Sequence, residues 1–165
     1  MTERREVWIT GVGLLTCLGE GLETAWSRLE RGDPPSYDDK SFAPYIVHPA
    51  TPIAYDKHIP KKSDQRQMET WQRIGVYSAG MALADAGIAG NAEILDHTDM
   101  IVAAGGGERD IAVDTAIMAG VRKTNEPGAF LNERLMSDLR PTLFLAQLPN
   151  LLAGNISLVH GVVGS

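Results

Sequence analysis

SDQRQMETWQRIGVYSAGMALADAG, residues 63–87, is the stretch that decides the fold, and it predicts one long helix. Ser63 is the predicted N-cap, Asp64 suits the positive end of the helix dipole, and Gly87 ends the helix. Many of its side chains are small, so another backbone can approach closely, and the helix is expected to be buried in the centre of the fold. The expected buried stripe is Met68, Trp71, Gly75, Ala79, Ala82 and Ala86.

Two short apolar runs on either side of this helix predict buried strands. Val7–Thr10 ends in Gly11-Val12-Gly13, and Asp99–Ala104 ends in Gly105-Gly106-Gly107. Continuous apolarity with a glycine exit is typical of a strand that is covered on both faces. Strands that alternate with helices indicate an α/β fold.

Further helices are expected on both sides of these elements. Glu23–Arg31 should end at Gly32, while Glu108–Arg122 and Phe130–Leu139 should flank a turn at Asn125–Gly128. Pro141 should open a helix over Thr142–Ala153, kinked at Pro149 and capped by Gly154, with Ile156–Val159 as strand or helix extension. Asp33–Pro60 holds six of the nine prolines and is expected to be a loop, extended only near Ile46-Val47 and Ile53–Tyr55.

Composition narrows the class of protein. The chain of 165 residues is 44% hydrophobic and 22% charged, which is ordinary for a globular domain. A net charge of −6 argues against nucleic-acid binding. One cysteine, Cys17, permits no internal disulfide, and the N-terminus lacks a secretory signal, so a cytoplasmic location is expected. The apolar region Leu143–Val163 contains too many polar residues for a membrane span.

The glycine runs and the histidines give no cofactor or metal signal. Gly11-Val12-Gly13 is followed by Thr16 where a dinucleotide fingerprint needs its third glycine. Glu108, after the second run, would repel a phosphate, so a dinucleotide-binding domain is only a third interpretation. Cys17 has no local base or cation and is expected to be a small buried side chain. Metal-ligand spacing is absent among His48, His58, His97 and His160.

Basic residues gather at and beyond the start of the long predicted helix. The group contains Lys57, Lys61, Lys62, Arg66 and Arg73, in a chain that is acidic overall. It is either a solvated helix end or a docking patch for an acidic partner. The residues alone leave both open.

Together these segments resemble the N-terminal half of a β-ketoacyl-acyl carrier protein synthase of the KAS I/II type, which has the thiolase fold. Val7–Gly13 with Thr16 and Gly19 resembles that family's opening strand, and Gln65–Glu69 through Ala82–Gly87 resembles its long helix. Asn150–Gly154, His160-Gly161 and Gly164 resemble the segment before the nucleophile strand. The loop at Phe42–Ile46 and the segment 141–161 look like a divergent paralogue for very-long-chain acyl groups of lipid A.

The resemblance implies an architecture and a boundary. Residues 1–165 would form a thiolase-like domain with a layered mixed sheet around a buried central helix, homodimeric when complete. The chain stops in an apolar run at Gly161–Ser165, so the sequence is expected to be truncated before the nucleophile segment.

The resemblance also implies a reaction without a cofactor or a metal. A cysteine would take the acyl chain from acyl carrier protein, and two histidines with backbone N–H donors would stabilise the enolate and oxyanion as malonyl-carrier loses CO2. All of these residues would follow Ser165, so this segment contributes no catalytic residue and is expected to be inactive alone. Cys17 stands where the family often has proline.

Supporting roles can be transferred to specific positions. Arg66 matches a basic family position that docks acyl carrier protein, and Lys62 lies beside it, whereas two neighbouring basic positions read Ser63 and Gln67 here. The acyl pocket and the dimer interface would include Gly107, Glu108, Leu143 and Phe144.

One departure supports an alternative. The family usually has a glycine-rich run with a bulky gating residue where this sequence has Gly107-Glu108-Arg109-Asp110. A charged loop is compatible with a non-catalytic ketosynthase-like partner or chain-length factor that binds acyl carrier protein. The residue at the nucleophile position would distinguish the two.

Overall fold

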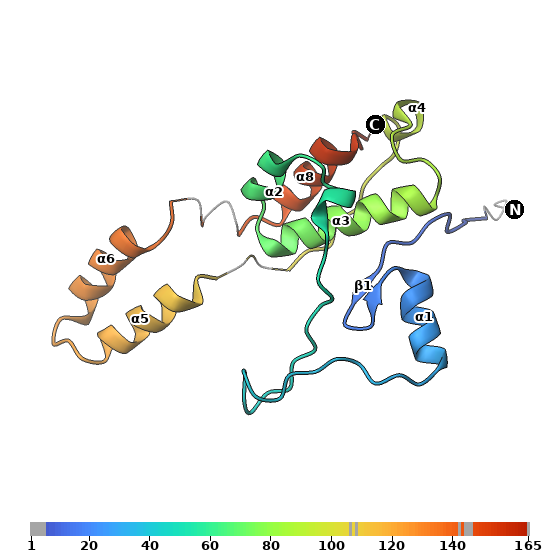
Figure 1. Cartoon of the computed structure of the whole chain (residues 1–165). Coiled ribbons are helices and arrows are strands. Elements are labelled where there is room, and N and C mark those ends of the chain that lie inside the picture. The colour runs from blue at the N-terminus through green and yellow to red at the C-terminus, as the bar shows by residue number, and fades with distance from the viewer. Residues whose placement is uncertain (1–5, 106, 108, 142, 144–146, 165) are drawn as a thin grey trace, which may run out of the picture.

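A computed structural model describes residues 6–105, 107, 109–141, 143 and 147–164. A helical body carries a helix hairpin that projects to one side, and an N-terminal unit lies on the other (Figure 1). The elements, in chain order, are β1 (Leu15–Thr16), β2 (Gly19–Glu20), α1 (Leu22–Glu30), the 3-10 turn η1 (Tyr55–Lys57), α2 (Lys62–Gln67), α3 (Thr70–Asp85), α4 (Ala92–Leu95), α5 (Ile111–Val121), α6 (Pro127–Asp138) and α8 (Asn150–His160).

Helix α3 is the centre of the body, as the sequence predicts. Val76 and Tyr77 are fully buried, and α3 packs along α8. The close approach depends on Gly75, because a Cβ there would lie 2.7 Å from Cδ1 of Leu152. The core around α3 is completed by Ile59, Met68, Leu95, Leu152, Ile156 and Val162.

The predicted single helix from Ser63 is two helices. Met68 is extended at φ −95° and ψ 139°, which separates α2 from α3. Glu69 and Gln72 form a capping box that starts α3. The Ser63 hydroxyl donates to Asp64 rather than capping a helix, so that prediction is wrong. Gly87 has a φ of 71° and follows α3, which confirms the predicted stop.

The buried face of α3 also differs from the predicted stripe. Met68 is buried, but within the helix the buried residues are Gln72, Val76, Tyr77 and Gly80. The remaining stripe residues, Trp71, Gly75, Ala79, Ala82 and Ala86, are half-buried.

The predicted strands are extended segments without ladder hydrogen bonds. Among the described residues the sheet consists of β1 and β2 alone, which pair antiparallel. These residues therefore do not form the layered mixed sheet that the resemblance implies. From 100 to 104, half-buried and exposed residues alternate as in a strand, yet no backbone hydrogen bond joins this segment to another described residue. A strand is defined by a hydrogen-bonded neighbour, which apolar composition alone cannot provide.

The N-terminal extended segment lies directly on α3. A Cβ on Gly13 would lie 1.9 Å from the carbonyl oxygen of Ser78, and one on Gly11 would lie 2.4 Å from that of Ala82. The backbone N–H of Val12 donates to Oδ2 of Asp85 at 2.9 Å. Glycine is therefore required by close backbone contact, whereas Val7, Trp8 and Ile9 are exposed.

Helix boundaries nearer the C-terminus are partly as predicted. Helices α5 and α6 occupy the two predicted helical segments, although α6 begins at Pro127, inside the predicted turn. The sequence predicts that Gly154 ends a helix, but Gly154 lies inside α8, which ends at His160 and is followed by Gly161 with a φ of 74°. Pro149 precedes the first turn of α8, where its missing N–H costs no helical hydrogen bond.

The α5–α6 hairpin is apolar and largely uncovered. Phe130 packs on Gly120, where a Cβ would lie 2.2 Å from the ring. Ile111, Met118 and Met136 are exposed. An apolar helix pair of this kind normally packs against further protein.

The long loop and the surface charges complete the description. Asp38 and Val47 exchange two backbone hydrogen bonds, so the loop is extended where the sequence predicts it near Ile46-Val47.

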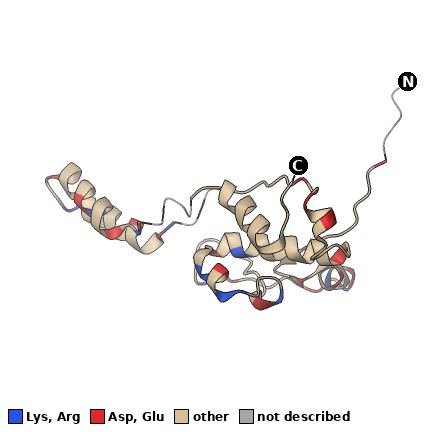
Figure 2. Ribbon diagram, turned by 90° about the horizontal axis from the view of Figure 1, so that it is seen from above, with Lys and Arg blue, Asp and Glu red and all other residues tan. Residues whose placement is uncertain are grey.

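Basic and acidic segments are interspersed over the body and the hairpin (Figure 2). None of the described helices is long and apolar enough to cross a membrane.

Candidate functional site: a basic elbow and a buried tyrosine network

Helices α2 and α3 meet at a basic elbow. A surface pocket of about 380 Å³ lies there and is lined by Lys62, Gln65, Arg66, Met68 and Arg73, which together we call the α2–α3 elbow. The sequence-predicted docking residues Arg66 and Lys62 therefore share one pocket. Met68 is buried and provides its apolar floor.

Two of the four polar residues in this elbow, Lys62 and Gln65, bind the carboxylate of Asp56. The Lys62 ammonium forms an ion pair with Asp56, and this contact is the main reason that the pKa of the Asp56 carboxyl lies below its usual value. Gln65 donates to Asp56 and to the carbonyl oxygen of Ile59. Arg66 uses only its Nε, which donates to the carbonyl oxygen of Lys62 at 3.2 Å.

The predicted five-residue basic cluster is divided by the structure. Lys62, Arg66 and Arg73 line the elbow, but Lys57 turns away and pairs with Glu20 at 2.8 Å. Sequence proximity predicted a single cluster because it could not show that Glu20 of β2 lies beside η1.

Glu20 is the acceptor of a hydrogen-bond network that no sequence pattern indicates. Its Oε1 accepts from Lys57 Nζ at 2.8 Å and from the Tyr77 hydroxyl at 2.9 Å. The hydrogen bonds from Lys57 and then Tyr77 hold the pKa of the Glu20 carboxyl below its usual value. Burial, followed by the bond to Glu20, raises the pKa of Tyr77 to about 12. In the sequence, the one indication of this network is a tyrosine among the small residues of α3.

Two histidines lie against the same part of α3. His58 contacts the edge of the Tyr77 ring, with 4.8 Å between ring centroids. His160 Nε2 lies 2.8 Å from the carbonyl oxygen of Val76, which assigns the proton to that nitrogen. Burial is the largest cause that lowers the pKa of each imidazole, so both are neutral at pH 7. Gly80 makes this packing possible, because a Cβ would lie 2.6 Å from the His160 ring.

The two imidazoles predict a loss of stability on mild acidification. Their pKa values are held below the ordinary 6.5, so the unfolded chain takes up protons first as pH falls. The stabilisation is present above about pH 6.5 and is lost as pH falls through the folded pKa values. Urea unfolding between about pH 7 and pH 5, a window above the carboxylate range, should show this loss. His160→Gln should flatten the pH dependence, and an unchanged slope would contradict the assignment.

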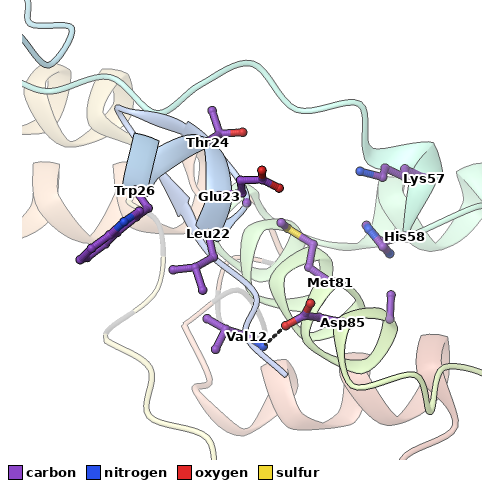
Figure 3. Close-up of a pocket in the computed structure, with 11 residues that line it drawn as sticks. Val12, Leu22, Glu23, Thr24, Trp26, Lys57, His58, Met81 and Asp85 are labelled. Atoms are coloured by element: carbon purple, nitrogen blue, oxygen red, sulfur yellow. Dashed lines mark hydrogen bonds between the residues drawn. The ribbon is translucent and has the colours of Figure 1, made fainter. Parts of the chain in front are cut away.

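A larger pocket opens between α1 and the C-terminal half of α3 (Figure 3). Its volume is about 770 Å³, and Val12, Leu22, Trp26 and Met81 form an apolar wall. Lys57 and His58 lie across from Leu22 and Trp26, and Asp85 lies beside Val12. The residues that line it include no nucleophile paired with a base, so the pocket has no catalytic arrangement.

The predicted acyl-pocket residues are only partly described. Gly107 and Leu143 are half-buried and lie in the two connections between the body and the α5–α6 hairpin. Glu108 and Phe144 lie outside the described residues. Their predicted role therefore stays a prediction.

Cys17 and the possible metal ligands are the remaining reactive groups of the described residues. Cys17 is a free thiol in the turn between β1 and β2. The sequence predicts a buried side chain, but Cys17 is only half-buried, because a hairpin with two residues in each strand covers one side of the turn. Within the described part of the chain, no three His, Cys, Asp or Glu side chains come together to hold a metal ion.

Comparisons with known proteins identify the family of this chain. Residues 4–165 match the family model described as the N-terminal domain of β-ketoacyl synthases. Curated relatives include two proteins named 3-oxoacyl-[acyl-carrier-protein] synthase 2, from Vibrio cholerae and Vibrio harveyi, each 24% identical over 98% of this chain. The chain spans only 37% of their length.

Solved structures share the fold. A β-ketoacyl synthase from Burkholderia phymatum gives a TM-score of 0.64 at 21% identity, over 95% of this chain and 37% of that one. The ishigamide ketosynthase/chain length factor gives 0.59 at 18% identity, over 94% and 36%. The predicted thiolase-like fold class is thus confirmed, although its sheet is incomplete in the described residues. The chain belongs to the β-ketoacyl synthase family and carries its N-terminal domain.

Proposed function

We propose that the protein carrying this chain is a condensing enzyme of fatty-acid biosynthesis. An acyl group moves from the thiol of acyl carrier protein to an enzyme cysteine. Malonyl-carrier then loses CO2, and the resulting enolate carbon attacks the acyl thioester carbonyl. A carbon–carbon bond forms, the cysteine thiolate leaves, and 3-oxoacyl-carrier is the product. No residue of this chain is proposed as that cysteine.

The family match over residues 4–165 carries this proposal. The names of the two Vibrio relatives support a 3-oxoacyl thioester on acyl carrier protein as the product class. A homodimer and a cytoplasmic location are part of the same proposal. They are supported by the exposed apolar α5–α6 hairpin and by the single cysteine.

Within this reaction the segment would supply binding surfaces. Arg66 and Lys62 would dock acyl carrier protein, since they lie in one basic pocket on α2. The connections that hold Gly107 and Leu143, with Glu108 and Phe144, would contribute to the acyl pocket near the dimer interface. An apolar hairpin next to these connections supports this placement.

The test is an assay on the native protein that contains this sequence. Incubation with acyl-carrier and malonyl-carrier should release CO2 and form 3-oxoacyl-carrier, and intact mass should show an acyl adduct on the enzyme. Absence of both product and adduct would contradict the proposal. The isolated 165-residue chain is the negative control and is expected to form no product.

Charge reversal at Arg66 tests the docking surface. Arg66→Glu should weaken affinity for acyl carrier protein about tenfold or more, because it replaces attraction by repulsion at the site of contact. The side chain is exposed, so the melting temperature should stay unchanged. Calorimetric titration of acyl carrier protein measures the effect, with Arg31→Glu at the C-terminal end of α1 as the matched variant. Equal affinity of the native and Arg66→Glu proteins would remove the docking role.

A non-catalytic chain-length partner is the second candidate. It is favoured by the charged sequence Glu108-Arg109-Asp110 beside the expected acyl pocket. This candidate predicts binding of acyl carrier protein with no acyl adduct in the intact mass. The same experiment therefore separates the two functions.

A further inference from the structure

We propose that Arg73 joins Arg66 in a two-arginine site at the α2–α3 elbow that binds carboxylate side chains of an acidic protein partner. The proposal rests on the proposed function for the identity of that partner, acyl carrier protein. The docking residues transferred from the family were Arg66 and Lys62 alone, both on α2, and the proposal adds Arg73, which lies on α3.

The two guanidinium groups keep donors available in one pocket. Both line the elbow pocket of about 380 Å³, and neither forms an ion pair with a described carboxylate. Arg66 uses only Nε, whereas Arg73 donates from Nη2 to the Thr70 hydroxyl at 3.3 Å. Lys62 is already neutralised by Asp56, so the uncompensated positive charge at the elbow belongs to the arginines.

Tyr55 holds Arg73 in place. The Arg73 guanidinium lies over the Tyr55 ring, 5.2 Å from its centroid. Stacking on an aromatic face restricts the long side chain before any partner arrives, which reduces the entropy lost on binding. Tyr55 in turn contacts the buried ring of Tyr77 edge-on, with 6.0 Å between centroids. Arg73 is thereby fixed to the centre of the fold.

The chemistry of the site favours carboxylates of a protein surface. A guanidinium presents a planar fork of donors that matches a carboxylate, and a half-buried site beside Met68 and Tyr55 strengthens the attraction. The Asp56 carboxylate, bound to both Lys62 and Gln65, would repel a dianionic phosphate more strongly than a carboxylate. The position also explains how docking could persist although Ser63 and Gln67 are uncharged, since Arg73 supplies a cation from the next helix.

The experiment uses the native protein and two probes, unacylated acyl carrier protein and a helical glutamate-rich peptide. Arg73→Gln should weaken binding of both probes about five- to tenfold, and Arg66→Gln should do the same. Each variant should also reduce the salt dependence of binding. Arg73→Lys keeps the charge but loses the fork, so it should recover only part of the affinity. Arg31→Gln, which removes one cation from the C-terminal end of α1, is the control and should bind as the native protein does.

Other results would overturn either the two-arginine site or the identity of its partner. Arg73→Gln with native affinity for both probes, while Arg66→Gln is weakened, would remove Arg73 and leave the docking surface of the proposed function standing. Loss of peptide binding with unchanged carrier affinity in both variants would support the two-arginine site and remove the carrier protein as its partner. Inorganic phosphate that displaces the peptide at a lower concentration than acetate does would overturn the carboxylate assignment. Circular dichroism of each variant checks that the helices are retained.

Discussion

Gly13→Ala is expected to lower the free energy of unfolding by about 3 kcal/mol, because the new methyl group has no space. Its Cβ would lie 1.9 Å from the carbonyl oxygen of Ser78 and 3.0 Å from the backbone nitrogen of Ala82. Both atoms belong to the backbone of α3 and cannot rotate away, so the N-terminal segment must move off the helix. Urea unfolding followed by circular dichroism measures the difference.

The chain provides a glycine control for this substitution. Gly154 lies inside α8, is exposed, and has no atom within 4 Å of an added Cβ. Gly154→Ala should therefore raise the free energy of unfolding by about 0.5–1 kcal/mol, as expected for alanine in a helix interior. If Gly13→Ala were as stable as the native protein, the packing of residues 11–13 on α3 would be refuted.

Tyr77→Ala is expected to be similarly damaging, with a loss of about 3–5 kcal/mol. The side chain is fully buried, and its removal leaves a cavity beside Tyr55 and His58 while Glu20 loses a donor. Tyr77→Phe keeps the ring and removes only the hydroxyl, so it should cost about 1–2 kcal/mol. A loss in Tyr77→Phe equal to that in Tyr77→Ala would show that the hydrogen bond, not the packing, dominates.

Tyr77 also predicts that the folded protein loses stability at alkaline pH. The pKa of Tyr77 is raised from 10 to about 12 in the folded protein. The stabilisation that comes from the neutral Tyr77 hydroxyl is therefore fully present below about pH 10 and is lost as pH rises toward 12. Tyrosinate absorbance should show one late-titrating tyrosine, and that signal should be absent in Tyr77→Phe.

The helices could be predicted because their signals are local. Gly32 and Gly87 have positive φ values, and each follows the C-cap residue of α1 or α3, near the predicted helix ends. The buried face of α3 could not be predicted, because small residues surround the whole helix and no stripe is distinctive. Gln72 is buried although it is polar, since its side chain completes the capping box with Glu69.

The strands and the site depended on contacts that sequence spacing does not show. Segment 99–104 has a strand's composition, but pairing depends on a neighbour elsewhere in the fold. Arg66 and Lys62 were predicted as docking residues because Arg66 matches a basic position of the family and Lys62 lies beside it in the sequence. The stacking of Arg73 on Tyr55 and the bond from Tyr77 to Glu20 join residues that lie 18 and 57 positions apart, and no local pattern marks either pair.

The exposed methionines of the α5–α6 hairpin provide a built-in chemical footprint. Met118 is 59% exposed and Met136 is 82% exposed, whereas Met68 is only 5% exposed. Hydrogen peroxide converts accessible methionine to the sulfoxide, so the two hairpin thioethers should oxidise well before Met68. Any protein that covers the hairpin would shield them, and peptide mass mapping could then report assembly residue by residue without a label. Oxidation would also place a polar group on an apolar surface, which would make the hairpin's contacts sensitive to peroxide.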